Sequence, residues 1–481
     1  MASSINSILK KVILNVKPSK EEFAEMNKLI NNFVDRVEKR IEELKIDTEI
    51  FVGGSFAKKT VIKKTMGHRT LKGAVCKAPC FLDDPKLKTV KLTPHSKECG
   101  FQFMDIKKDH YDSENTETQG LSDVDIFLRF DKKYQDTISE LTKKILSNME
   151  NVSLIHGSRD YFKIKIRDDF FVELIPVIKV GKPEESLNVT DLSYSHVKYI
   201  NKKIKSEKIK EEIMITKAFC YANHCYGAES YINGFSGYAI ELLIFYYGSF
   251  LKFIKAMNKS KKMEKIIIDI EKQFKNKNQV MMNLNSSKLQ SPIILIDPTH
   301  KNRNALAALN EETFERFKKS AKDFLDNPSL EAFEEKKTDL EKIKKNSDKK
   351  SFEFILLEAT TDKQEGDIAG SKLLKFYNHF SEEIEKFFKI KDKGFNYNGK
   401  TSARYYFVVK SKEEIEISGP SIKDKKNVEA FEKKHRGYFT KNGKIYSKEI
   451  VDFSLKEFFK KWVEKNSKKI KEMSMQKFIE I

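Results

Sequence analysis

The chain has 481 residues, and its 91 lysines and arginines against 71 aspartates and glutamates give a formal net charge of +20. This length suggests two to four domains with ample material for buried cores. The charge favours a polyanionic partner such as a nucleic acid, with a generally lysine-rich proteome as the alternative explanation. Five cysteines are too few for a disulfide framework, and no apolar stretch is long enough for a membrane span or a signal peptide, so we expect a cytoplasmic protein without a membrane partner.

Helix and strand signals follow one another in a clear order through the first 190 residues. Ser19 and Glu22 have the spacing of a capping box, and apolar residues recur behind them at helical intervals, so we expect a helix over residues 19–44. Runs rich in β-branched and aromatic residues then predict strands at 49–52, 124–130, 162–166 and 171–177. The first part of the chain is therefore expected to combine helices with a sheet.

Two short motifs in this part point to phosphate and metal chemistry. Gly54 and Ser55 form a turn in which the missing glycine side chain admits a triphosphate and the serine hydroxyl can donate to it. Asp123 and Asp125 lie on one face of the following strand, and Glu173 comes from a later strand. Three such carboxylates suit Mg²⁺ and two-metal nucleotidyl transfer. Each motif alone matches by chance or as a solvated edge, but together, in this order, they favour a nucleotidyltransferase.

A long segment, residues 64–119, separates the glycine-serine turn from the paired aspartates. A link of about a dozen residues would suffice to join the two motifs, so we interpret the segment as an insertion. Four side chains in it have a spacing that suits a tetrahedral structural zinc site, with buried free thiols as the alternative. They are Cys76, Cys80, His95 and Cys99.

Beyond about residue 191 the pattern becomes helical and then mixed. We expect one helix over residues 209–225 and another, uninterrupted, over 237–257. Residues 331–351 carry many charges and are expected to form a solvated helix or linker. Further on, strands at 352–358 and 405–410 flank a helix near 370–388, which suggests a small α/β module of the kind that contacts RNA by shape and backbone.

Several longer runs carry a resemblance to a known family. They are Tyr226-Gly227-Ala228-Glu229, Gly234-Phe235-Ser236-Gly237-Tyr238, Glu241-Leu242-Leu243-Ile244, Asp297-Pro298-Thr299 through Arg303-Asn304-Ala305, and Gly419-Pro420 with Val428 through His435. In these runs the chain resembles the archaeal (class I) CCA-adding tRNA nucleotidyltransferases. The resemblance covers nearly the whole chain apart from the insertion.

The resemblance implies an architecture and an activity. The fold is expected to be α+β, with a nucleotidyltransferase palm of mixed sheet and helices over residues 1–190. A helical central domain would follow over 191–305, and a C-terminal tRNA-binding α/β module over 306–481. Such a protein would add C, C and A to the 3′ end of tRNA from CTP and ATP, with Mg²⁺ and without a nucleic-acid template, releasing pyrophosphate.

The resemblance also implies roles for residues of the palm. Asp123, Asp125 and Glu173 would bind Mg²⁺ and carry catalysis, while Ser55 and Lys58 would contact the nucleotide triphosphate. Two of these depart from the family pattern. Glu173 stands where the family commonly has aspartate, and Lys58 stands where it usually has arginine, so the charge is kept but a bidentate phosphate contact is lost.

In the helical part, the resemblance implies that His196, Lys217 and Tyr226 hold the incoming ATP or CTP. Arg303 would read the base edge together with tRNA phosphates. Without the resemblance, Lys217 would be expected in solvent, and His196 and Tyr226 in the core.

Three alternatives stay open at this stage. The chain could be another nucleotidyltransferase, of the oligoadenylate synthetase or poly(A) polymerase type, or a tRNA-binding pseudoenzyme in which Glu173 and the insertion close the site. The oligomeric state also stays open, with a homodimer as one option.

Overall fold

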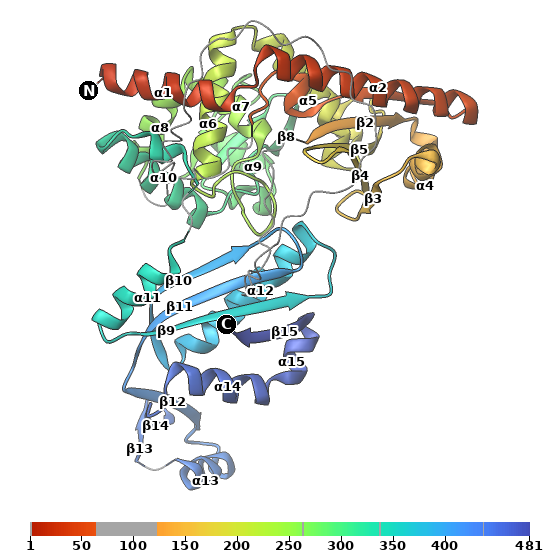
Figure 1. The fold of residues 1–481 in the computed structure, drawn as a ribbon. Helices are drawn as coiled ribbons and strands as arrows, with labels where there is room; N and C mark the ends of the chain where they lie inside the picture. Colours follow the sequence, from red (N-terminus) through yellow and green to blue (C-terminus); the bar gives the residue numbers. More distant parts are fainter. Residues whose placement is uncertain (1, 64–122, 262–263, 336–337, 436) are drawn as a thin grey trace, which may run out of the picture.

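The computed structural model describes residues 2–63, 123–261, 264–335, 338–435 and 437–481. An upper body is built from the N-terminal and central parts of the chain, and a lower body from the C-terminal part (Figure 1). The predicted zinc ligands Cys76, Cys80, His95 and Cys99 lie outside the described residues.

The palm is a five-stranded mixed sheet with helices packed against it. Its strands, in the order β1-β2-β5-β4-β3, are β1 (Thr48–Val52), β2 (Val124–Phe130), β5 (Phe170–Ile178), β4 (Tyr161–Arg167) and β3 (Val152–Ile155). Only β2 and β5 pair in parallel, and the other neighbours are antiparallel. All four predicted strands are thus confirmed to within one or two residues.

The long helix α2 (Lys20–Leu44) begins where its capping box predicts. The Ser19 side chain accepts a hydrogen bond from the Glu22 backbone N–H, and the Glu22 carboxylate accepts one from the Ser19 N–H. Its apolar stripe is buried against the sheet and α4 (Ile138–Ile145) through Met26, Ile30, Phe33 and Val37. Local signals therefore account for this helix.

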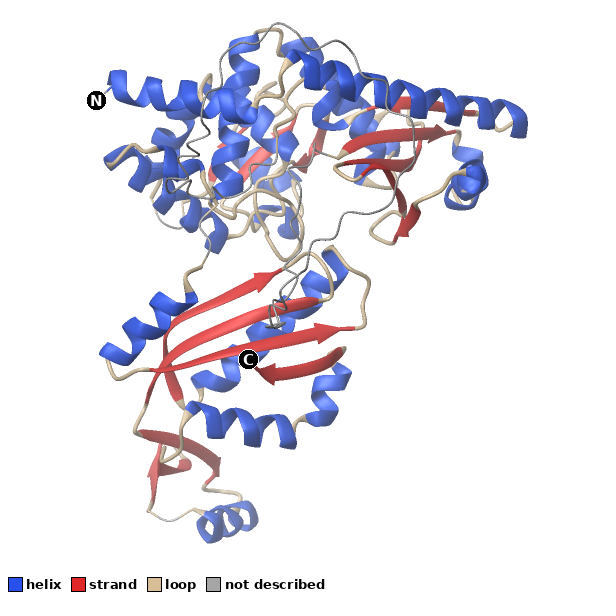
Figure 2. Cartoon of the chain, viewed as in Figure 1, coloured by secondary structure: helices blue, strands red, loops and turns tan. Residues whose placement is uncertain are grey.

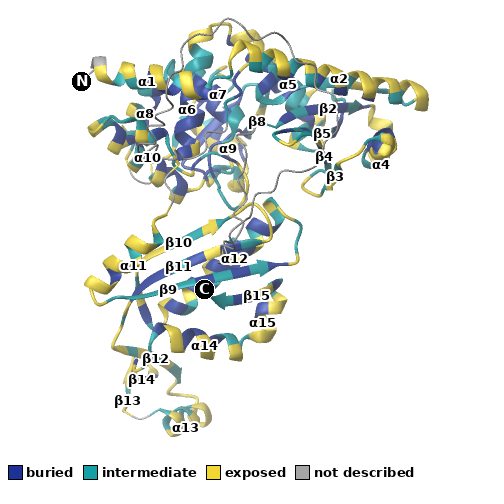
Figure 3. Ribbon diagram, viewed as in Figure 1, coloured by how far each residue is buried: buried dark blue, intermediate teal, exposed yellow. Residues whose placement is uncertain are grey.

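The central unit is helical around one large apolar core. Its helices are α1 (Ala2–Val16), α5 (Ser193–Lys203), α6 (Glu207–Ala222), α7 (Gly237–Tyr247), α8 (Phe250–Lys259), α9 (Lys277–Asn283) and α10 (Glu311–Asp326). A small sheet of β6 (Ile266–Ile268), β7 (Ile293–Asp297) and β8 (His300–Asn304) joins them. Helices α6 and α7 form the buried centre (Figure 3). The core reaches from Leu9 to Phe333, and so extends on both sides of residues 191–305.

The expectation of one helix over 237–257 is wrong. The chain bends by 91° between α7 and α8. Gly248 adopts a left-handed φ of +81°, which ends α7, and the Ser249 side chain then caps α8 by accepting from the Lys252 N–H. Among the described residues no single helix is long and apolar enough to cross a membrane, and only this bent pair reaches the necessary length and composition.

The C-terminal unit is an α/β layer with a small appendage (Figure 2). Its sheet has the order β10-β11-β9-β15, formed by β10 (Phe388–Tyr397), β11 (Ser402–Ser411), β9 (Glu353–Thr361) and β15 (Met475–Glu480). Helices α12 (Asp367–Glu385) and α14 (Leu455–Lys465) share its core, with α15 (Ser467–Glu472) beside them and α11 (Leu340–Lys349) before β9. The appendage holds β12 (Glu414–Ser421), α13 (Lys425–Lys434), β13 (Tyr438–Lys441) and β14 (Lys444–Ile450). The predicted strands and helix of this module are confirmed, while the appended strands were not predicted.

Candidate nucleotide and metal site

The three predicted carboxylates come together at one end of the palm sheet. In the parallel pairing of β2 with β5, Asp125 stands directly opposite Glu173. Asp123 immediately precedes β2, two residues from Asp125 and therefore on the same face. The residues on either side of Asp125 and of Glu173, such as Val124 and Val172, are buried. The apolar face of each strand thus anchors the sheet in the core and turns the carboxylates away from it.

The glycine-serine turn lies directly against Asp125. The Gly53 N–H donates to the backbone carbonyl of Asp125 at 2.8 Å. Gly54 has a φ of +59°, and a Cβ atom there would overlap the Asp125 carboxylate, standing 2.8 Å from its Cγ. Glycine is thus required twice, for the backbone conformation and for the close approach. Ser55 follows in the short helix α3 (Gly54–Ala57), beside this contact.

Burial raises the pKa of Asp125 to about 6, and the positive charges of Lys58 and Lys217 act against that shift. A carboxylate that is costly to ionise in this place gains from a bound cation. Lys163 on β4 reaches the same carboxylates, with its Nζ 3.6 Å from Asp123 Oδ2 and its backbone paired with Glu173. Sequence reasoning missed Lys163, although it alternates with buried Phe162 and Ile164 toward the same face.

The donor chemistry of these residues fits Mg²⁺, because carboxylate oxygens are its preferred protein ligands. The room that Gly54 leaves beside the Asp125 carboxylate also suits a close approach of phosphate and metal. Within the described ranges, however, no three histidine, cysteine, aspartate or glutamate side chains are grouped closely enough to hold a metal ion. The carboxylates are therefore neighbours on the sheet rather than a closed coordination shell.

Lys58 and Lys217 meet at a shared buried carboxylate. Glu241 on α7 forms ion pairs with Lys58 Nζ at 2.7 Å and with Lys217 Nζ at 3.0 Å. The Thr60 hydroxyl donates to Glu241 Oε1 at 2.7 Å and accepts from Lys217 Nζ at 2.9 Å. Lys217 is only 1% exposed, so it is not the solvated lysine that its sequence context alone would suggest. Glu241 belongs to one of the runs that carry the family resemblance, but the sequence did not indicate a role for it.

Tyr226 lies beside this ion-pair cluster. A Cβ atom at Gly237 would stand 2.9 Å from the Tyr226 hydroxyl and 3.8 Å from Lys217 Cε, so the three residues are in contact range. The Tyr226 ring stacks on Tyr221, with ring centroids 4.8 Å apart. Burial raises the pKa of the Tyr226 hydroxyl, which therefore stays a neutral donor.

His196 and Arg303 meet at a second buried carboxylate, Asp297, at the end of β7. Asp297 Oδ2 lies 3.0 Å from His196 Nε2 and 2.7 Å from Arg303 Nη1. Its Oδ1 accepts from the Tyr238 hydroxyl at 3.0 Å and from both the N–H and the hydroxyl of Thr299 at 2.8 Å. These donors hold the pKa of Asp297 well below its usual range in spite of burial, which acts in the opposite direction. The sequence signal for Asp297 was its place after four consecutive buried apolar residues.

Tyr238 connects the two clusters. Its ring stacks on the His196 ring with centroids 3.9 Å apart, and Lys58 Nζ lies 5.9 Å from its centroid. The structure thus gathers Lys58 and Lys217 around Glu241 and His196 and Arg303 around Asp297, with Tyr238 in contact with both clusters. Burial lowers the pKa of His196, although the hydrogen bond to Asp297 opposes this.

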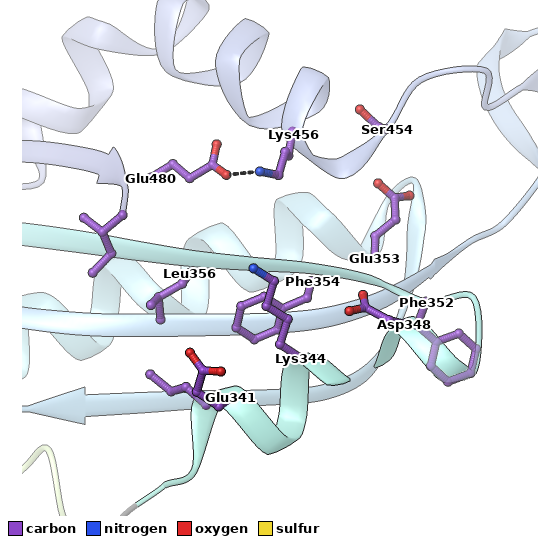
Figure 4. A pocket seen from close by; sticks show the side chains of 12 residues that line it. Glu341, Lys344, Asp348, Phe352, Glu353, Phe354, Leu356, Ser454, Lys456 and Glu480 are labelled. Carbon is purple, nitrogen blue, oxygen red and sulfur yellow. Dashed lines mark ion pairs between the residues drawn. The ribbon is translucent and has the colours of Figure 1, made fainter. Parts of the chain in front are cut away.

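A pocket elsewhere has a different character. It has a volume of about 470 Å³ and lies between α11, β9 and the end of the chain (Figure 4). Lys456 forms an ion pair with Glu480 across it, and Phe354 and Leu356 supply apolar lining. None of the predicted site residues lines it. It is therefore separate from the candidate site on the palm.

Comparisons with known proteins show which proteins this chain is similar to. The family described as tRNA nucleotidyltransferase, second domain, matches residues 211–334, which include Lys217, Tyr226, Asp297 and Arg303. The CCA-adding enzyme of Nanoarchaeum equitans is 40% identical over 195 residues, which are 40% of this chain and 48% of that enzyme. The chain thus aligns with about half the length of that relative.

The CCA-adding enzyme of Methanocaldococcus jannaschii is 25% identical over 458 residues, which cover 92% of this chain and 87% of that enzyme. A solved cytoplasmic RNA terminal U-transferase is 12% identical and covers 70% of this chain and 99% of its own, with a TM-score of 0.46. The alignment over 92% of the chain necessarily includes parts of the palm, the central unit and the C-terminal unit. The chain is therefore similar to archaeal CCA-adding enzymes over nearly its whole length, and to the tRNA nucleotidyltransferase family in its central part.

Proposed function

We propose that this protein adds C, C and A to the 3′ end of tRNA, using CTP and ATP without a nucleic-acid template. One observation carries the proposal beyond the similarity to archaeal CCA-adding enzymes. Four features are close neighbours: the glycine turn, Asp125 and Lys58 of the palm, and Lys217 of the central unit. A triphosphate bound there would lie against the backbone of the turn and the carboxylates, and the positive charges of the two lysines would attract it.

Residues of the palm are proposed to bind the metal and the triphosphate. Asp123, Asp125 and Glu173 would hold Mg²⁺, which when bound activates the attacking 3′ hydroxyl and neutralises the leaving pyrophosphate. Gly54 and Ser55 admit the triphosphate and donate to it.

Lys58 of the palm and charged and polar groups of the central unit complete the nucleotide site. Lys58 and Lys217 supply positive charge without the planar fork of arginine. Tyr226 supplies a neutral hydroxyl donor, and His196 and Arg303, held by Asp297, lie next to the Tyr238 ring. We propose that Arg303 reads the base edge, since a guanidinium held on a carboxylate keeps further N–H donors available.

The C-terminal unit is proposed to bind the tRNA. Strand β10 carries exposed lysines at 389, 391 and 393, which suit contacts with phosphates. Action on tRNA agrees with the expected cytoplasmic location, and a homodimer stays a prediction.

Incubation with a tRNA that lacks its terminal CCA, Mg²⁺ and labelled CTP tests the proposal. We expect two CMP residues to be added, and one AMP when ATP is then supplied. Folded protein that adds no CMP would contradict the proposed function. Repeated addition of AMP without use of CTP would instead identify a polymerase of the poly(A) or oligoadenylate type.

The remaining alternative is a tRNA-binding pseudoenzyme. It would show tRNA affinity without turnover, and Glu173→Asp would not restore activity. If Glu173 is a metal ligand, we expect Glu173→Asp to retain or raise incorporation, because the shorter side chain restores the residue common in the family. Incorporation of labelled CMP measures this directly.

The Gly54→Ala variant should lose about a hundredfold in CMP and AMP incorporation. The new methyl group would overlap the Asp125 carboxylate and displace it, and a misplacement of about 1 Å costs roughly this factor. The matched control is Gly399→Ala, in the turn between β10 and β11. Gly399 also has a positive φ, +80°, but no atom of the described residues lies within 4 Å of a Cβ atom there. Equal losses in both variants would show that backbone strain, rather than contact with Asp125, causes the effect.

A further inference from the structure

Glu241 occupies an unusual position in the candidate site. It has no exposed surface, and it holds two ammonium groups that belong to different parts of the molecule. Lys58 follows the glycine-serine turn of the palm, whereas Lys217 lies on α6 of the central unit. The carboxylate of Glu241 thus links the palm to the central unit at the point where the nucleotide is proposed to bind.

The charges in this cluster do not cancel. Two buried ammonium groups, 7% and 1% exposed at Lys58 and Lys217, share the single carboxylate of Glu241. The other carboxylate near both lysines is Asp125, whose charge is proposed to be taken up by Mg²⁺. Buried charge is costly unless it is paired and hydrogen-bonded. The Thr60 hydroxyl and carbonyl accept from Lys217, and this supports the lysine but adds no negative charge. An anion placed beside the cluster would balance it.

Glu241 also keeps the two lysines together. Without the Glu241 carboxylate that both of them contact, the two ammonium groups would repel each other in a medium of low dielectric constant. They would then separate, and either one would turn toward water or lose its proton. The shared carboxylate therefore determines where both positive charges stand.

We propose that Glu241 is a positioning residue that holds Lys58 and Lys217 as a preformed pair for the triphosphate of the incoming nucleotide. This rests on the proposed function for the identity of the ligand. Glu241 does not contact the nucleotide and acts only through the two lysines. Because CTP and ATP share the triphosphate, the effect of Glu241 is the same for both.

A double-mutant cycle on nucleotide binding tests the proposal. The variants are Glu241→Gln, Lys58→Met and the two combined, with affinities for CTP and ATP measured by titration with and without Mg²⁺. We expect Glu241→Gln to lower the affinities for CTP and ATP by the same factor, about tenfold. In the Lys58→Met background the same change should have a clearly smaller effect, because one of the two lysines that it positions is gone.

Two results would overturn the proposal. If the loss of nucleotide affinity in the double variant equals the product of the losses in the two single variants, Glu241 does not act through Lys58. Unchanged or tighter binding of nucleotide to Glu241→Gln would mean that the carboxylate merely repels the triphosphate or supports the fold.

A milder pair of variants covers the case in which Glu241→Gln does not fold. Thr60→Val keeps the shape of the side chain but removes the hydroxyl that bridges Lys217 and Glu241, and Thr60→Ser keeps that hydroxyl. We expect weaker binding of both nucleotides in Thr60→Val and wild-type binding in Thr60→Ser. Equal affinities in the two variants would contradict the proposal.

The titrations contain no tRNA and require no turnover, so they separate this inference from the proposed function. Protein that binds nucleotides with the expected cycle but adds nothing to tRNA would contradict only the proposed function. If the protein is active but the losses of affinity in the two single variants multiply in the double variant, only the proposed role of Glu241 is contradicted.

Discussion

Asp125→Asn is expected to lose about a thousandfold or more in the incorporation of both CMP and AMP, which corresponds to roughly 4 kcal/mol of transition-state stabilisation. Asp125 stands opposite Glu173 on the sheet and against the Gly54 turn, and we propose that it serves both the metal and the triphosphate. The amide keeps the shape of the side chain but removes its charge. Affinity for tRNA should stay within about twofold of wild type, because the side chain faces the sheet end and the turn rather than the C-terminal unit.

The control for this experiment is Asp168→Asn. The Asp168 side chain is 87% exposed and forms an ion pair with Lys165 on its own hairpin, so its loss should leave incorporation unchanged. Incorporation of labelled CMP and AMP and a tRNA-binding titration are measured on both variants. Lost tRNA binding in Asp125→Asn would show that Asp125 supports the structure rather than the chemistry.

The second large effect is expected for Asp297→Asn. Asp297 accepts hydrogen bonds or ion pairs from His196, Arg303, Tyr238 and Thr299, and it has no exposed surface. An asparagine offers one acceptor oxygen and turns its NH₂ group toward donors, which leaves Arg303 without its counter-charge. Breaking a buried ion pair in this way costs about 3 kcal/mol of unfolding free energy. Denaturant unfolding measures the loss, and nucleotide affinity should fall with it because both His196 and Arg303 lose their anchor.

The effect of Asp297 should depend on pH in a definite direction. Its pKa in the folded protein lies below the ordinary value of 3.8, so the folded state favours the ionised form. The stabilisation is therefore complete at neutral pH and decreases as the pH falls through 3.8 toward the lower folded value. The difference in unfolding free energy between wild type and Asp297→Asn should shrink between about pH 5 and pH 3.

Asp326→Asn, at the exposed end of α10, is the control for Asp297. It should leave the unfolding free energy within about 0.5 kcal/mol of wild type. A difference between wild type and Asp297→Asn that stays constant, or grows, on acidification would contradict an ionised Asp297.

Features that depend on neighbours along the chain could be predicted from the sequence. The capping box of Ser19 and Glu22 acts within one turn, so the start of α2 was predicted correctly. Alternation on β2 placed Asp123 and Asp125 on one face before any fold was known. The bend at Gly248 and Ser249 was missed because the apolar pattern runs through it, although both residues are typical of a helix end and a helix start.

The sequence by itself determined the strands of the palm, the shared face of its aspartates, the glycine turn and the resemblance to archaeal CCA-adding enzymes. Only the tertiary structure decided that Glu241 holds Lys58 and Lys217 and that Asp297 holds His196 and Arg303. Asp297 is 101 residues from His196, and Glu241 is 181 residues from Thr60. No periodicity reaches over such separations. Buried charges find partners wherever the fold brings them together, because a charge without a partner in a core is too costly to keep.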